Sequence, residues 1–149
     1  YLPLGILLMI YLLKKKSYIE IIGLTNGVLG SAIVNFLVKQ YYMRIRPENF
    51  FRVKETGFSF PSGHSMVAFS FYFTLVYIVF RNKDWDIKKI IAWIMTSILV
   101  VTIGFSRIYL GVHWPTDIVG GFSLGFIWLS VNISIVELLH KKSNRQDLY

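Results

Sequence analysis

The chain has 149 residues, of which 54% are hydrophobic and only 16% are charged, and it contains no cysteine. Soluble domains carry about a quarter charged residues, so this composition favours a protein that has the lipid bilayer as its solvent. The apolar and aromatic content excludes a disordered chain, and the lack of cysteine excludes a disulfide scaffold and a thiolate metal site. The length allows one domain, and we treat residues 1–149 as a single unit.

Five apolar segments follow one another along the chain: 1–13, 18–38, 62–80, 88–105 and 118–139. The last four would form helices of about 27 to 33 Å, which is enough to cross a hydrocarbon core of about 30 Å. The first segment is too short to cross, so we interpret it as the end of a helix that begins before residue 1. No segment alternates with a period of two, which argues against a β-barrel. The sequence therefore predicts an all-α, polytopic transmembrane bundle.

The basic residues are distributed unevenly between the two sides of this predicted bundle. If every segment crosses, the connections at 14–17 and 81–89 and the tail at 140–149 share one side, and they hold ten of the sixteen basic residues. Because cytoplasmic loops are enriched in lysine and arginine, these regions and the C-terminus are predicted to be cytoplasmic.

The opposite side then receives the two loops 39–61 and 106–117, which also contain prolines and serines, and two of the three histidines lie in or directly beside them. Basic residues are disfavoured on the outer side of a membrane, so their presence there needs another explanation. We therefore expect the chemistry to lie in these two loops. The six basic residues concerned are Lys39, Arg44, Arg46, Arg52, Lys54 and Arg107.

The first candidate cluster is formed by Lys39 and Arg46, which precedes Pro47. If the second segment continues as a helix to residue 46, these two cations are seven residues apart and lie on one face, where they could hold a phosphate. The alternative is that both side chains merely reach the lipid headgroups. Arg44 lies about 140° from that face of such a helix, so for Arg44 we expect only headgroup contact.

The second cluster is the run from Ser59 to Ser65, at the start of the third segment. Ser62 is a plausible N-cap, and Gly63 permits close approach of the backbone. The free amide groups at a helix start can bind an anion, and His64 would lie beside them. The alternative is a tight turn that enters a helix, with His64 an interfacial histidine bonded to a neighbouring carbonyl.

The third cluster runs from Ser106 to Asp117 and contains Arg107 and His113. His113 and Asp117 are four residues apart, so their side chains come within hydrogen-bond reach on one helical face, although Pro115 complicates a helix here. A carboxylate bonded to one imidazole nitrogen leaves the other free to attack, and Arg107 offers a fork for a phosphate. The alternative is that Asp117 only caps the last segment, and both roles could coexist.

Together these three clusters resemble the signature of the type 2 phosphatidic acid phosphatase (PAP2) superfamily. The matching positions follow in order: Lys39 and Arg46–Pro47, then Pro61 to His64, then Ser106–Arg107, His113 and Asp117. The resemblance implies a membrane lipid phosphatase of six helices, of which this chain would contain the last five. The compact outer loops are similar to those of the small bacterial phosphatidylglycerophosphate and undecaprenyl-pyrophosphate phosphatases.

The resemblance also implies a role for each matched residue. His113 would be the nucleophile, Asp117 would orient it, and His64 would be the general acid for the leaving group. The phosphate would be held by Lys39, Arg46, Ser62, Gly63 and Arg107. The family needs no metal or other cofactor. From the residues alone, the carboxylate partner already favours His113 over His64 as the nucleophile.

The predicted function is hydrolysis of a lipid phosphomonoester or pyrophosphate through a phosphohistidine at the extracytoplasmic face. The expected partners are a phosphorylated lipid and the bilayer, with no nucleic acid, while the oligomeric state is not indicated. Phosphatidylglycerophosphate, undecaprenyl pyrophosphate and phosphatidic acid all fit, and specificity is expected in 48–58 and in the preceding helix. The alternative is a non-enzymatic lipid-phosphate binder or transporter, which could dispense with both histidines. Four full-length spans argue against a soluble haloperoxidase with the same cradle.

Smaller features predict contacts within the bundle. The paired glycines Gly23 and Gly27, and Gly121 and Gly125, predict close helix packing inside one bundle. Asparagines in the second segment are expected to bond across helices, and the glutamates near the inner surface, Glu20 and Glu137, are expected either to snorkel or to pair with nearby lysines.

Overall fold

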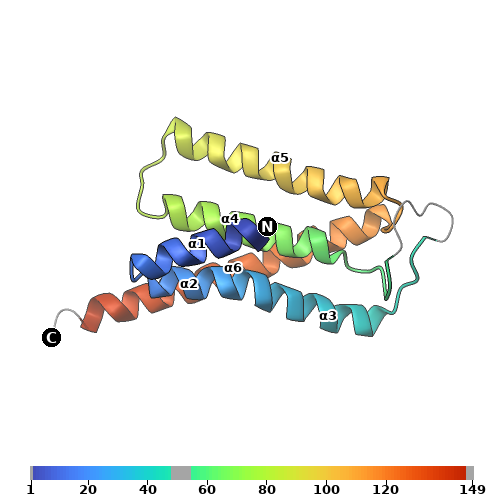
Figure 1. The fold of residues 1–149 in the computed structure, drawn as a ribbon, viewed down its shortest axis with the longest axis horizontal. Coiled ribbons are helices and arrows are strands. Elements are labelled where there is room, and N and C mark those ends of the chain that lie inside the picture. The colour runs from blue at the N-terminus through green and yellow to red at the C-terminus, as the bar shows by residue number, and fades with distance from the viewer. Residues whose placement is uncertain (1, 48–54, 147–149) are drawn as a thin grey trace.

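The computed structural model describes residues 2–47 and 55–146 as a bundle of helices (Figure 1). In chain order the elements are α1 (Leu2–Lys14), α2 (Tyr18–Thr25), the π-helical turn η1 (Asn26–Gly30), α3 (Ser31–Tyr42), α4 (Gly63–Phe80), α5 (Ile87–Tyr109) and α6 (Pro115–Gln146). These described ranges contain no β-strand, so the prediction of an all-α fold is confirmed. Glu48, Arg52, Lys54 and most of the predicted specificity segment 48–58 lie outside the described residues.

Four helical stretches are long and apolar enough to cross a membrane: Tyr18–Tyr42, Gly63–Phe80, Ile87–Tyr109 and Pro115–Asn144. They correspond to the four predicted spans, although α6 begins and ends several residues beyond the predicted segment. The 13-residue helix α1 begins midway along the bundle, as expected for the short first segment (Figure 1). The chain is therefore a multi-pass membrane protein.

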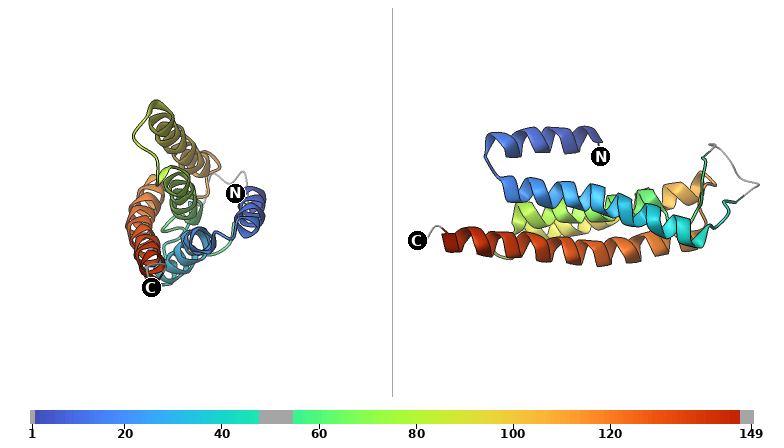
Figure 2. Two further views of the ribbon diagram at one scale, coloured as in Figure 1. Left: turned by 90° about the vertical axis from the view of Figure 1, so that its left-hand side faces the viewer. Right: turned by 90° about the horizontal axis from the view of Figure 1, so that it is seen from below.

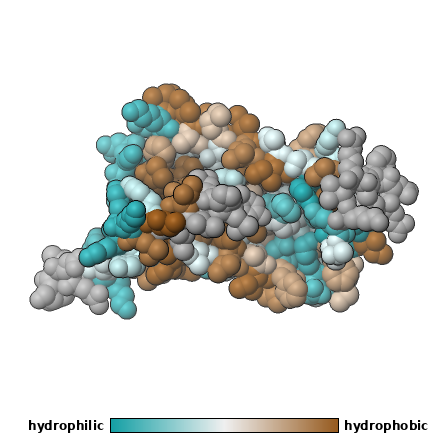
Figure 3. Space-filling model, viewed as in Figure 1, coloured by the Kyte–Doolittle hydropathy of each residue, from teal (hydrophilic) through white to brown (hydrophobic). Residues whose placement is uncertain are grey.

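The two ends of the bundle differ in what they carry. At one end lie the α1–α2 turn, the α4–α5 connection and the last turns of α6, which contain the three basic regions (Figure 1). At the other end, the end of α3 and the end of α5 meet the beginnings of α4 and α6. Apolar residues cover much of the middle of the visible face, and hydrophilic residues gather at the basic end (Figure 3). The three sequence clusters therefore share the end opposite the basic regions.

Helix α4 forms the centre of the bundle and packs against both α5 and α6, while α5 and α1 lie at the outside of the bundle (Figure 2). Phe71 of α4 is buried against Leu12 and Leu24, and Phe73 is buried against Val100 and Leu129. Because α4 contributes buried side chains on both sides, it fixes the positions of the helices that carry the three clusters.

The paired glycines pack inside the bundle, as predicted. A Cβ atom on Gly23 would lie 2.8 Å from Val136 Cγ2, and one on Gly125 would lie 2.9 Å from Phe69 Cβ. Gly27 and Gly121 are similarly close to α4. These contacts bring α2 and α6 against their neighbours more closely than any side chain would permit.

Polar side chains also bond across the helices. Asn26 donates to Asn132 Oδ1 at 2.8 Å, and Asn132 in turn donates to Thr74 Oγ1 at 3.0 Å. Of the two expectations for the glutamates, pairing with lysines is not seen for Glu20 or Glu137 in the described residues. Glu137 instead accepts a bond from Arg81 at 2.8 Å, and Glu20 lies 3.4 Å from the ring of His140.

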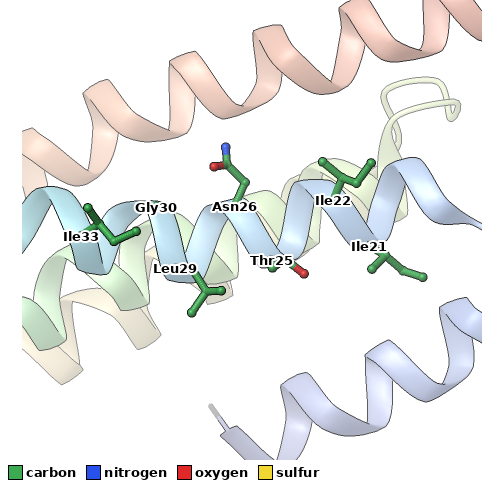
Figure 4. Close-up of a pocket in the computed structure, with 7 residues that line it drawn as sticks. All are labelled: Ile21, Ile22, Thr25, Asn26, Leu29, Gly30 and Ile33. Atoms are coloured by element: carbon green, nitrogen blue, oxygen red, sulfur yellow. The ribbon is translucent and has the colours of Figure 1, made fainter.

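The π-helical turn η1 was not predicted. Here the Trp128 indole of α6 donates to the backbone oxygen of Asn26 at 3.0 Å, and a Cβ on Gly30 would lie only 2.2 Å from this ring. Single π-helical turns can occur inside α-helices, and this one lies where the Trp128 ring packs against the helix. An apolar groove follows the same stretch of helix and is lined by Ile21, Ile22, Thr25, Asn26, Leu29, Gly30 and Ile33 (Figure 4). None of the predicted site residues lines this groove.

Candidate active site

The first cluster adopts a different backbone from the predicted one. Helix α3 ends at Tyr42, and Met43 follows in the left-handed conformation with φ of 45°. The predicted continuation of the helix to Arg46 is therefore wrong. Pro47 disfavours helical geometry at Arg46, the residue before it. The segment after α3 is instead fixed by a hydrogen bond from the Ser59 backbone amide to the Arg44 backbone oxygen, at 2.8 Å.

The segment 43–47 has no helical or strand structure, and its side chains alternate in exposure. Met43 and Ile45 are exposed, whereas Arg44 and Arg46 are partly buried. This alternation is the period of two that an extended chain produces, whereas a helix would have separated two residues so spaced by about 200°. Arg44 therefore faces the same site as Arg46, and the expectation that it would only reach the headgroups is wrong.

The third cluster brings His113 and Asp117 together, as its spacing predicted. His113 Nδ1 lies 3.2 Å from Asp117 Oδ2. Both residues are buried, with exposed fractions of 3% for His113 and 0% for Asp117. A carboxylate buried this deeply needs hydrogen-bond donors around it, and the imidazole N–H supplies one of them.

The start of α6 explains why the carboxylate points back toward the histidine. Pro115 occupies the first helical position, where its lack of an N–H costs no hydrogen bond, so the proline favours the helix start that it appeared to complicate. Two residues later, Asp117 accepts the Trp114 backbone amide at 2.9 Å, in the manner of a capping box. Asp117 thus serves both the helix start and His113, and the two alternatives considered from the sequence coexist.

Arg46 contacts the other nitrogen of the His113 imidazole. Its Nη1 atom donates to the Val112 oxygen at 2.9 Å and lies 3.4 Å from His113 Nε2. Because a guanidinium can only donate, this contact favours the tautomer with a lone pair on Nε2 and the proton on Nδ1, facing Asp117. Burial, followed by the positive charges of Arg46 and Lys39, lowers the pKa of His113, although the Asp117 hydrogen bond opposes this shift.

Glu55 joins two of the predicted phosphate ligands. One carboxylate oxygen lies 3.0 Å from Arg46 Nη1, and the other bonds Arg107 Nη2. No role was predicted for Glu55 from the sequence. A carboxylate is the anion that an arginine pair can hold in place of a phosphate, so its position marks an anion site beside His113.

The second cluster begins α4 as predicted. Ser62 is the N-cap and accepts the Ser65 amide at 3.4 Å. The Ser62 amide donates to the Asp117 backbone oxygen at 3.0 Å, so this amide already has a partner in the structure. The amides of Gly63 and His64 follow at positions where a helix offers no internal acceptor. This turn packs closely against α6, as the short distance shows: a Cβ atom placed on Gly121 would lie only 2.7 Å from the Ser62 backbone oxygen.

Lys39 and His64 are the two remaining predicted site residues. Lys39 Nζ donates to the Phe58 oxygen at 2.5 Å and lies 3.4 Å from the Ser59 oxygen. His64 is half-buried and lies within electrostatic range of Lys39 and Arg46. Among the described residues, no three side chains of His, Asp or Glu come together as a metal site would require. The site is therefore a cluster of cations around two imidazoles and a buried carboxylate.

These features agree with comparisons to known proteins. Residues 20–141 match the PAP2 superfamily. The chain belongs to this superfamily. It is 41% identical over 96 residues to phosphatidylglycerophosphatase B of Bacillus subtilis, a match that covers 64% of this chain and 47% of the relative. It is 34% identical over 137 residues to the undecaprenyl-diphosphatase of Sulfolobus acidocaldarius, a match that covers 87% of this chain and 60% of the relative. The chain thus spans about half to three-fifths of these relatives.

The fold has a counterpart among solved structures. The crystal structure of the first transmembrane PAP2 type phosphatidylglycerolphosphate phosphatase from Bacillus subtilis superimposes with a TM-score of 0.82 at 31% sequence identity. The match covers 91% of this chain and 68% of that protein. The predicted family and the predicted helical membrane fold are therefore both confirmed.

Proposed function

We propose that this protein is a metal-independent lipid phosphatase that hydrolyses a phosphomonoester or pyrophosphate through a phosphohistidine. Membership of the PAP2 superfamily and the names of its relatives support this class of reaction. The observation that carries the proposal is the buried imidazole of His113, held by Asp117 through one nitrogen and facing Arg46 with the other. That arrangement presents a neutral nitrogen lone pair to an anion held by arginines.

In the first proposed step, His113 Nε2 attacks the phosphorus atom of the lipid, the N–P bond forms and the P–O bond to the lipid breaks. The leaving oxygen takes a proton from His64, which lies in the first turn of α4. In the second step, water attacks the phosphohistidine and gives its proton to His64. Inorganic phosphate leaves, and both histidines return to their original states.

The charge that develops on the phosphoryl oxygens is stabilised by Arg46, Arg107 and Lys39, with the amide of Gly63 at the start of α4. Phosphoryl transfer depends mainly on such positioning and electrostatic stabilisation, so cations can take the place of a metal. The substrate phosphate would replace the Glu55 carboxylate on the two arginines, because both anions need the same donors.

The site is proposed to open on the extracytoplasmic side, with the C-terminus in the cytoplasm. Ten of the sixteen basic residues fall in the regions at the opposite end of the bundle, and basic loops favour the cytoplasm (Figure 1). A membrane-impermeant label should react from outside with a Thr56→Cys variant and not with an Asn82→Cys variant. The reverse pattern would place the site in the cytoplasm.

The substrate class is tested by phosphate release from phosphatidylglycerophosphate, undecaprenyl pyrophosphate and phosphatidic acid in detergent micelles. The proposal expects release from at least one lipid, inhibition by orthovanadate and no release by a His113→Ala variant. A protein that binds these lipids with vanadate-sensitive affinity but releases no phosphate from any of them would instead be the binder or transporter.

A further inference from the structure

Arg44 is two residues from Arg46 but contacts a different part of the site. Its Nη1 atom donates to Asp117 Oδ1 at 2.8 Å and to Thr116 Oγ1 at 2.6 Å. Arg46 instead faces His113, the Val112 oxygen and Glu55. The two arginines therefore approach the His113–Asp117 pair from its two ends.

Each oxygen of the Asp117 carboxylate has its own donors. Oδ2 accepts from the Trp114 amide and lies against His113 Nδ1, while Oδ1 accepts from Arg44. The Asp117 side chain is fully buried, whereas the Arg44 side chain is 39% exposed. With both oxygens occupied, the carboxylate cannot rotate without breaking a charged hydrogen bond.

The Arg44 side chain is itself held in place. Its guanidinium carbon lies 5.6 Å from the centre of the Trp114 ring, and the Trp114 indole donates to the Ile45 oxygen at 3.1 Å. The Arg44 carbonyl accepts both the amide and the hydroxyl of Ser59. These contacts tie the extended segment 43–47 to the start of α6.

We infer that Arg44 is a positioning residue, which holds the Asp117 carboxylate in the orientation that presents His113 to the phosphate. Arg44 touches no reacting atom in the proposed mechanism, so it acts only through Asp117. This inference rests on the proposed function for its effect on turnover, but the contact between Arg44 and Asp117 is independent of it.

Arg44 also shares the negative charge of Asp117 with His113. The charged groups that face His113 are Asp117 from α6, Lys39 from α3 and Arg46 from the segment 43–47. Two of these groups have charged partners of their own, since Arg44 binds Asp117 and Glu55 binds Arg46. Without Arg44 the carboxylate is less neutralised, so the imidazolium form of His113 becomes more favourable.

The test compares Arg44→Met with Arg44→Lys in the full chain. Arg44→Met should lower kcat by about 10- to 100-fold, the range expected for losing a hydrogen bond to a charged group. It should also move the acidic limb of kcat/KM to higher pH. Arg44→Lys keeps the charge and should leave the limb in place while recovering most of kcat.

A matched control is Arg81→Met, which removes another arginine–carboxylate bond of 2.8 Å at the opposite end of the bundle. This variant should leave the acidic limb unchanged. A limb unmoved in Arg44→Met, or moved equally in Arg44→Lys, would overturn the positioning role. If Arg44→Met does not fold, the acidic limb of kcat/KM in Arg44→Lys tests the inference instead. A shift of that limb in Arg44→Lys would contradict charge sharing, because lysine keeps the positive charge.

Titration of the His113 ring by NMR, assigned with a His113→Gln variant, separates this inference from the proposed function. The pKa of His113 should rise in Arg44→Met even if the protein releases no phosphate from any lipid. An unchanged pKa in a folded Arg44→Met variant would refute the coupling, whether or not the wild-type protein is a phosphatase.

Discussion

The two ends of the bundle each contain an arginine bonded to a carboxylate at 2.8 Å, yet the two pairs differ in their surroundings. At the basic end, the Glu137 side chain is 39% exposed and bonds Arg81 and Tyr77. At the other end, Asp117 is fully buried and also bonds His113. An exposed pair is screened by solvent and contributes little, whereas a buried carboxylate controls whatever shares its hydrogen bonds.

Burial and bonding partners, rather than the ion pair itself, distinguish the end that carries the candidate site. Both ends have cations, carboxylates and a histidine, since Glu20 faces His140 at the basic end. Within the described residues, extended chain, helix starts and a buried carboxylate meet at the end that carries the three clusters.

The largest effect is expected at His113. His113→Ala should reduce phosphate release by about 10⁴-fold or more, because the attacking nitrogen is lost. Asp117→Asn should reduce kcat less, since the imidazole remains but is no longer held in the right tautomer. Steady-state kinetics on one lipid measures both, and a His113→Ala variant with near wild-type kcat would contradict the assignment.

The next effect is expected at His64 and depends on the leaving group. His64→Ala should lower turnover of a lipid substrate by about 10²- to 10⁴-fold, the usual contribution of a general acid. An aryl phosphate leaves as a stable anion, so this variant should recover much of its loss on that substrate. His113→Ala should recover nothing, and rescue of His113→Ala alone would exchange the two roles.

The pH dependence should reflect the lowered pKa of His113, which burial and the neighbouring cations cause. The neutral imidazole attacks, so kcat/KM falls as the pH drops through this pKa. Because the pKa is depressed, the acidic limb should lie below the ordinary histidine value of about 6.5. A limb above that value would show that Asp117 outweighs burial.

The smallest effect is expected at the basic end. Arg81→Met should change the stability of the protein by at most about 1 kcal/mol, because the partner carboxylate is partly exposed. Thermal unfolding in detergent checks this value. A much larger loss, or a fall in kcat comparable with that of Arg44→Met, would remove the contrast between the two ends.

Much of the fold could be predicted from the sequence, because long apolar segments and charged connections follow directly from the thickness of the bilayer. The pairing of His113 with Asp117 also followed from their spacing, since both lie at a helix start. Arg44 was not predicted as a site residue because helical geometry was assumed for a segment that is extended. A Pro47 two residues beyond Ile45 was the available signal, and a period of two would have placed Arg44 beside Arg46.

Two further features could not be predicted, since they depend on contacts between distant segments. The bridge from Glu55 to Arg46 and Arg107 joins residues up to 52 positions apart. The bond from the Ser62 amide to the Asp117 oxygen depends on Gly121 allowing α6 to approach the start of α4. Neither has a local sequence pattern, because tertiary packing decides both.

The central claim is that His113 becomes phosphorylated without a metal, and trapping the intermediate tests it most directly. Wild-type protein incubated with a ³²P-labelled lipid in excess EDTA and quenched in alkali should retain a label that is stable to base and released by acid. His113→Ala should retain none, and His64→Ala should still be labelled by an aryl phosphate. Labelling of His113→Ala, or activity that EDTA abolishes and Mg²⁺ restores, would contradict the account.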